Sequence, residues 1–190
     1  MYVPEHLDDP NQLALRQKLD TITCDPTGYA AGTQPGPVTA LRKEMPHSIQ
    51  CICPAYRWER RSWDYNCHAF SLGFSTREEF WDARPKVEEL LPESDFMTIL
   101  IEQRVLDLRS RDRVQEGDLL LYYSGSELKH SGVVVRGRIR SKWGNGNMWE
   151  HLIGEVPLRY GDRVDPFNSP ESQSVLRKYL VHVVSGRGHS

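Results

Sequence analysis

The order of local structure signals along the chain most constrains its fold, because helical patterns come first and strand patterns follow. The predicted helices span residues 11–19, 66–72 and 76–91, the last of them interrupted at Pro85. The predicted strands span residues 97–101, 118–123, 131–135, 138–143, 148–153 and 175–184. Helices followed by a run of strands indicate an α+β fold with an antiparallel sheet.

Two of these strands are expected to form a hairpin, because the run Gly144-Asn-Gly-Asn separates them. A turn centred on Asn145 and Gly146 places Ser141 opposite Glu150, whereas a three-residue loop places Ser141 opposite His151. A shift of one residue moves every side chain to the other face of the sheet, and the sequence leaves both registers open.

The chain of 190 residues has the length of a single domain. Turn-forming clusters at residues 25–28 and 32–37 interrupt its first part. We therefore expect residues 1–54 to form a weakly structured N-terminal arm or leader, and residues 55–190 to form the domain that carries the function.

Residues 56–66 combine arginines with tryptophans and tyrosines, a pattern that can bind nucleic acid by stacking. The formal net charge of -2 and the isoelectric point near 6.4 argue against this, because nucleic-acid-binding domains carry a basic excess. No apolar run approaches the roughly 18 residues that a membrane helix needs. We therefore expect neither a nucleic-acid partner nor a membrane partner.

Cys67 is the candidate nucleophile, because it stands at the predicted start of the helix over residues 66–72. A helix start favours a thiolate through its backbone N–H groups and dipole. A cysteine nucleophile also needs a base, and His130 is the best candidate, since it directly precedes the apolar run Ser131-Gly-Val-Val-Val. His68 is expected to be an ordinary residue on the helix surface, and a second polar group at the cleft is the alternative.

No metal or cofactor is expected. Cys51 and Cys53 are separated by one residue, whereas zinc ligands are normally separated by two to four, and no second such pair is present. Four cysteines are also too few for a disulfide scaffold in a chain of this length.

Three short motifs follow one another along the chain. They are Asn66-Cys-His-Ala-Phe, Glu116-Gly-Asp followed by an apolar run, and His130-Ser-Gly-Val-Val-Val. This order resembles the NlpC type of papain-like cysteine hydrolases. Residues 141–151 and the run Val156-Pro-Leu-Arg-Tyr-Gly are similar to uncharacterised papain-like domains at the C-termini of bacterial Rhs-type toxins. The resemblance covers about residues 60–165.

The resemblance implies a papain-like fold in which an N-terminal helix carrying Cys67 packs on an antiparallel sheet carrying His130. It also implies a third polar residue that orients the histidine. His151 is the first candidate for this residue, Ser141 is next, and Glu150 is a further alternative. The run Asn66-Cys-His-Ala departs from the Asp-Cys-Ser-Gly common in the cell-wall enzymes, so specificity for wall peptides does not carry over.

The expected activity is hydrolysis of peptide or isopeptide bonds through a thioester on Cys67, in a bacterial toxin or effector. The alternatives are an acyltransferase or glutamine deamidase on the same fold, and a binding module without catalytic activity. The expected partners are a peptide or protein substrate and an immunity or inhibitor protein. The N-terminus lacks the pattern of a standard signal peptide, which fits either the cytosol or delivery as an effector.

Overall fold

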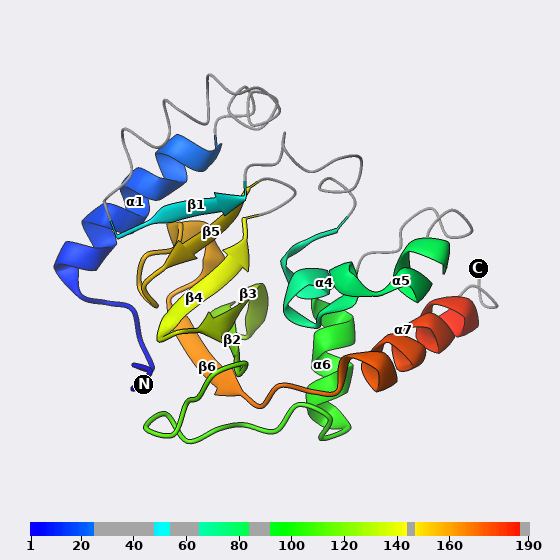
Figure 1. Cartoon of the computed structure of the whole chain (residues 1–190). Coiled ribbons are helices and arrows are strands. Elements are labelled where there is room, and N and C mark those ends of the chain that lie inside the picture. The colour runs from blue at the N-terminus through cyan, green and yellow to red at the C-terminus, as the bar shows by residue number, and fades with distance from the viewer. Residues whose placement is uncertain (25–47, 54–64, 84–91, 144–146, 187–190) are drawn as a thin grey trace.

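The computed structural model describes residues 1–24, 48–53, 65–83, 92–143 and 147–186. Its centre is an open six-stranded antiparallel sheet with the strand order β1-β5-β4-β3-β2-β6. Helix α1 lies on one side of this sheet, and α4, α5, α6 and α7 lie on the other (Figure 1). The predicted α+β class is therefore confirmed.

The strands are β1 (Gln50–Cys53), β2 (Leu119–Ser124), β3 (Glu127–Val135), β4 (Arg138–Lys142), β5 (Met148–His151) and β6 (Arg163–Phe167). The α-helices are α1 (Pro10–Cys24), α4 (Cys67–Ser71), α5 (Glu78–Ala83), α6 (Ser94–Glu102) and α7 (Ser172–Gly186). Two short 3-10 helices, η3 (Phe74–Thr76) and η5 (Leu158–Tyr160), complete the described elements.

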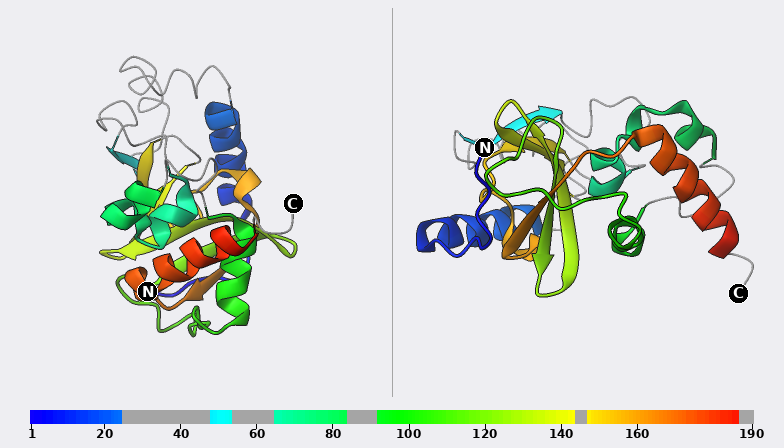
Figure 2. Two further views of the ribbon diagram at one scale, coloured as in Figure 1. Left: turned by 90° about the vertical axis from the view of Figure 1, so that its right-hand side faces the viewer. Right: turned by 90° about the horizontal axis from the view of Figure 1, so that it is seen from below.

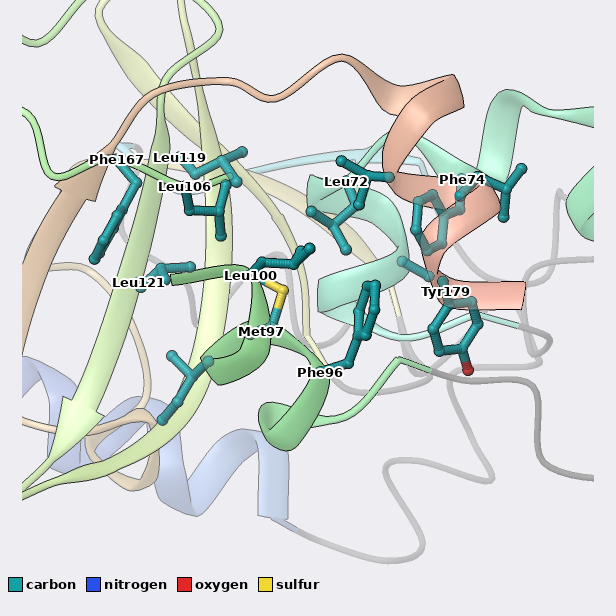
Figure 3. Close-up of a cluster of buried hydrophobic side chains, with 14 of the residues drawn as sticks. Leu72, Phe74, Phe96, Met97, Leu100, Leu106, Leu119, Leu121, Phe167 and Tyr179 are labelled. Carbon is teal, nitrogen blue, oxygen red and sulfur yellow. The ribbon is translucent and has the colours of Figure 1, made fainter. Parts of the chain in front are cut away.

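Both faces of the sheet are buried, and β2 shows this most clearly. Leu119 and Leu121 contribute to the hydrophobic cluster shared with α4, α6 and α7, shown in Figure 3. Leu120 and Tyr122 contribute to a second cluster, which includes Leu19 of α1. Successive residues of a strand point to opposite faces, so an almost continuous apolar strand is what a sheet covered on both sides requires.

Two helices occupy segments that were predicted as strands. Residues 97–101 belong to α6, and residues 175–184 belong to α7. In α6, Phe96, Met97 and Leu100 are buried together at the spacing of one helix face, and Phe96 packs against Tyr179 of α7 (Figure 3). Tertiary packing of these faces outweighed the β propensity of the individual residues.

Two edge strands, β1 and β6, were not predicted, and β6 takes the place assigned to the segment 175–184. Strand β6 contains Pro166, which argues against a central strand but is tolerated at an edge. Strand β1 has four residues, too few for a clear alternating pattern.

The prediction of a weakly structured arm over residues 1–54 does not describe the segments that the structure covers. The helix expected at 11–19 extends over the whole of α1, and Val3, Leu7 and Leu19 are almost fully buried. Strand β1 pairs with β5 in the central sheet. A boundary at residue 54 therefore separates segments that share one core, while residues 25–47 lie outside the described part of the chain.

The hairpin of β4 and β5 adopts neither of the two predicted registers. Ser141 pairs with Trp149, and Ile139 pairs with His151. The backbone N–H of Trp143 donates to the carbonyl of Asn147, so the loop is closed one step earlier than a turn at Asn145 and Gly146 requires. Residues 144–146 themselves lie outside the described part of the chain.

Candidate functional site

The site begins at the N-terminus of α4, where the sequence fixes the helix start at Cys67. The side chain of Asn66 accepts a hydrogen bond from the backbone N–H of Ala69 at 2.9 Å and so caps the helix. The amide nitrogen of the same side chain donates to the carbonyl of Pro92 at 2.8 Å. Both hydrogen bonds hold the first turn in place, and Cys67 is its first residue.

Strand β3 supplies the second part of the site. A bulge shifts its pairing with β2, so that Tyr122 faces His130 while Tyr123 faces Leu128. Bulges are common beside functional sites, because the extra residue redirects the side chains that follow it. His130 and Ser131, the two residues that follow this bulge, are fully buried.

His68 is also part of this site, which corrects the expectation of a residue on the helix surface. It is 5% exposed, and its Nδ1 lies 2.9 Å from the hydroxyl oxygen of Ser131. Two successive residues of β3 therefore serve the site in different ways. His130 approaches the thiol with its own side chain, whereas Ser131 binds the histidine beside Cys67.

These surroundings lower the pKa of the Cys67 thiol well below its ordinary value. Burial, the largest single effect, would raise the pKa, because it penalises the thiolate. The charges of His68 and His130 and their hydrogen bonds to the sulfur together outweigh burial. Such a thiol is deprotonated at pH values at which an ordinary cysteine is still protonated, and the thiolate is the nucleophilic form.

His130 is held mainly by an aromatic stack. Its ring lies parallel to the ring of Tyr160, with the centroids 4.0 Å apart and the planes 8° from each other. Tyr122 packs at 5.7 Å between ring centroids. Apart from the interaction with the thiol, neither ring nitrogen of His130 has a hydrogen-bond partner among the described residues.

The structure does not bring the predicted orienting residues to His130. The Nε2 of His151 lies 2.8 Å from the Ser141 hydroxyl, and its Nδ1 lies 2.7 Å from the carbonyl oxygen of Leu152. Glu150 pairs with Arg138 and Arg140. All three candidates are thus bonded elsewhere, and His151 in particular has no ring nitrogen left for His130.

The bonds of His151 define its protonation state. A carbonyl can only accept, so Nδ1 carries the proton and Nε2 accepts from the hydroxyl of Ser141. The indole N–H of Trp143 donates to the same hydroxyl oxygen at 2.9 Å. Burial, together with the charges of His130 and Arg138, lowers the pKa of His151 to about 3, although the bond to Leu152 opposes this shift. His151 is therefore a neutral structural histidine.

Tyr160 was not assigned a role from the sequence, although it stands in the run Val156-Pro-Leu-Arg-Tyr-Gly that carries part of the resemblance. Its contact with His130 joins residues 30 positions apart in the chain, and no local pattern predicts such a stack. The expectation for His68 was wrong for a different reason. Its partner, Ser131, lies beneath α4 because the helix packs on the sheet, and the sequence around Cys67 does not show this contact.

Within the described ranges, no group of three His, Cys, Asp or Glu side chains is arranged to hold a metal ion. No helix among those residues is long and apolar enough to cross a membrane. A pocket of about 410 Å³ lies between α6 and α7, lined by Phe96, Leu100 and Val181 among others, and it includes none of the residues around Cys67.

Comparison with known proteins gives one family. No curated protein and no solved structure matches the chain. A family model for a domain of unknown function, DUF7689, matches residues 57–167, a range that contains Cys67, His130 and Tyr160. The match spans α4 and the strands from β2 to β6 and covers more than half of the sequence, so the chain belongs to the DUF7689 family.

Proposed function

We propose that this protein is a cysteine hydrolase that cleaves peptide or isopeptide bonds, with Cys67 as the nucleophile and His130 as the general base and acid. The observation that carries the proposal is a buried cysteine at a helix start with a histidine from β3 beside its sulfur. A nucleophile with its base in reach is the arrangement that covalent catalysis needs.

The proposed reaction has two halves. In the first, the Cys67 thiolate attacks the carbonyl carbon, the carbon–nitrogen bond breaks, and protonated His130 gives its proton to the leaving amine. This leaves a thioester on Cys67. In the second, His130 takes a proton from water, the resulting hydroxide attacks the thioester, and the acid leaves as Cys67 is restored. Cys67 is 8% exposed and His130 is fully buried, so we expect the substrate to approach from the side of the cysteine.

The finer parts of the proposal follow from the resemblance to NlpC-type enzymes. The helix with the nucleophile precedes strands β2 to β6 of the antiparallel sheet, and β3 among them carries the base, an order that supports a papain-like fold. A toxin or effector role, a peptide or protein substrate, and an immunity or inhibitor protein as a partner belong to the same proposal. In those enzymes a polar third residue positions the histidine. Here the ring of Tyr160, stacked on His130, has that role.

The first test is the reactivity of Cys67. At about pH 6, iodoacetamide should alkylate Cys67 faster than the partly exposed Cys51, because only the thiolate reacts and an ordinary cysteine has a pKa of about 8.5. Peptide mass spectrometry after timed quenching measures both rates in the same sample. Equal rates at every pH would contradict the proposal and favour a binding module.

The second test is turnover. Cys67→Ala should abolish cleavage of a peptide library, together with any toxicity on expression in bacteria, while Cys51→Ser, the matched control, should leave both unchanged. Fragments in the library identify a hydrolase. Conversion of glutamine to glutamate without cleavage would instead identify a deamidase, and transfer of the acyl group to an added amine would identify a transferase.

A further inference from the structure

We propose that His68, held by Ser131, is a second catalytic histidine and forms the standing ion pair with the Cys67 thiolate, while His130 carries protons during turnover. This inference rests on the proposed role of Cys67 as the nucleophile. It assigns a function to the buried pair of His68 and Ser131. The motif around Cys67 gives these two residues no function by itself.

The first support is the way the two histidines are held. His68 has a polar tether, because its Nδ1 lies 2.9 Å from the Ser131 hydroxyl. His130 has no such tether among the described residues and rests on the ring of Tyr160 at 4.0 Å. A hydrogen bond fixes the position of a ring nitrogen, whereas a stack fixes the plane of the ring and binds neither of its nitrogens.

The second support is which nitrogen of His68 remains for the sulfur. Since Nδ1 is engaged by Ser131, Nε2 is the nitrogen left to interact with Cys67. When the pair ionises, the proton moves from the sulfur to Nε2, which gives a thiolate and an imidazolium. His68 keeps this proton, and the proton that His130 gives to the leaving amine is the one it took from water in the preceding turnover. In the imidazolium both nitrogens donate, and the Ser131 oxygen accepts from Nδ1.

The third support is the choice of a serine as the tether. Neutral His68 with its proton on Nδ1 donates to the Ser131 oxygen and leaves Nε2 free to take the proton of the thiol. The imidazolium makes the same bond, so Ser131 can keep its bond to His68 in both protonation states. A hydroxyl accepts this bond without adding a buried charge, which would be costly to desolvate. The pair is fully enclosed, since Ser131 is 0% exposed and His68 5% exposed, and buried polar groups of this kind interact strongly.

The chain offers a matched control for this pair. Ser141 is also fully buried, and its hydroxyl also binds a histidine, the Nε2 of His151 at 2.8 Å. His151 is not among the groups that act on the Cys67 thiol. Ser131→Ala and Ser141→Ala therefore remove the same hydroxyl from the same kind of bond, and only the first removes it from the proposed ion pair.

The experiment measures the rate of Cys67 alkylation by iodoacetamide from about pH 5 to pH 9, read by peptide mass spectrometry. We expect Ser131→Ala to raise the apparent pKa of Cys67 by about one unit, which slows alkylation about tenfold below that pKa. His68→Gln should raise it further. Ser131→Thr, which keeps a hydroxyl, should restore the wild-type profile, and Ser141→Ala should leave it unchanged.

Two results would overturn the inference: a wild-type profile for both Ser131→Ala and His68→Gln, or an equal shift for Ser131→Ala and Ser141→Ala. Failure of the proposed function looks different, because the wild-type protein itself would then show an ordinary thiol pKa. Thermal unfolding of each variant, followed by circular dichroism, identifies any variant that has lost its fold. If Ser131→Ala has lost its fold, the alkylation profile of His68→Gln tests the inference instead.

Discussion

At the scale of single residues, the described part of the chain holds His130 by an aromatic stack and gives its ring no orienting acceptor. His130 lies parallel to Tyr160 at 4.0 Å, and the predicted acceptors on β4 and β5 are bonded elsewhere. Aromatic contacts of this kind contribute about 0.5–1.5 kcal/mol beyond the area that they bury. An energy of that size can hold the plane of the His130 ring against Tyr160, although the stack binds neither ring nitrogen.

This arrangement predicts different outcomes for two changes at Tyr160. Tyr160→Phe keeps the ring and should retain most of the activity, measured with a peptide identified by the library screen. Tyr160→Leu removes the flat surface beneath His130 and should lower kcat by about tenfold or more, because misplaced catalytic groups are costly.

The control for this pair is the pH profile of Cys67 alkylation in both variants. It should change less than kcat does, because His68 still interacts with the thiol. Equal activity of Tyr160→Leu and Tyr160→Phe would contradict a positioning role for the stack.

The sequence identified Cys67 and His130 as candidates because each stands in a recognisable local setting, a helix start and the mouth of an apolar strand. It favoured a surface position for His68 over one at the cleft, and it gave Tyr160 no role. Their roles depend on contacts with Ser131 and His130 across the fold, which are created when α4 and η5 pack against β3. Such contacts have no periodic or local signature.

At the scale of elements, the hairpin of β4 and β5 encloses a histidine that stays neutral. His151 accepts from Ser141 and donates to Leu152, and burial is the main cause of its pKa of about 3. In the unfolded chain the same group has a pKa near 6.5. Below that value the unfolded state binds a proton that the folded state does not, so folding stability is lost as the pH falls from about 6.5 towards 3.

We therefore predict that His151→Gln makes stability less dependent on pH. Between about pH 6 and pH 4, the free energy of unfolding of the variant should fall less steeply than that of the wild type, by up to roughly 1.4 kcal/mol per pH unit. Urea unfolding at a series of pH values measures both slopes. His6→Gln, at an exposed position, is the control and should keep the wild-type slope.

The elements themselves were predictable in part. Strands β2 to β5 are predictable because they contain apolar or β-branched residues with turn signals between them. The sequence favours strands where the structure has α6 and α7, because short apolar runs fit either period until their packing partners are known. The register of β4 and β5 depended on the position of the loop, which Gly144-Asn-Gly-Asn does not define.

At the scale of the whole molecule, one buried cation fastens the N-terminal helix to the sheet. Arg16 of α1 is fully buried and donates to three backbone carbonyls, those of Leu7, Val156 and Gly161. Gly161 directly follows Tyr160, so the helix is bonded next to the residue that supports His130. Figure 2 shows α1 lying against the strands, on the side of the sheet away from α7.

Replacing this guanidinium should destabilise the whole fold. Arg16→Met leaves three buried carbonyls without their donor, and we expect it to cost roughly 2–4 kcal/mol of unfolding free energy. Gln17→Met introduces the same residue at an exposed position on the same helix and should change the stability by less than about 0.5 kcal/mol. Urea denaturation measures both, and similar values for the two variants would contradict this role of Arg16.

The stack of Tyr160 on His130 also has a consequence for the order in which the protein is made. Synthesis runs from the N-terminus, so Cys67 and His68 leave the ribosome first, His130 and Ser131 follow much later, and Tyr160 comes last. A nascent chain therefore carries a cysteine of ordinary reactivity for most of its synthesis. The groups that lower the pKa of the thiol are thus all made before η5, whereas the surface that holds His130 is made after them, so a chain that stops before Tyr160 lacks that surface.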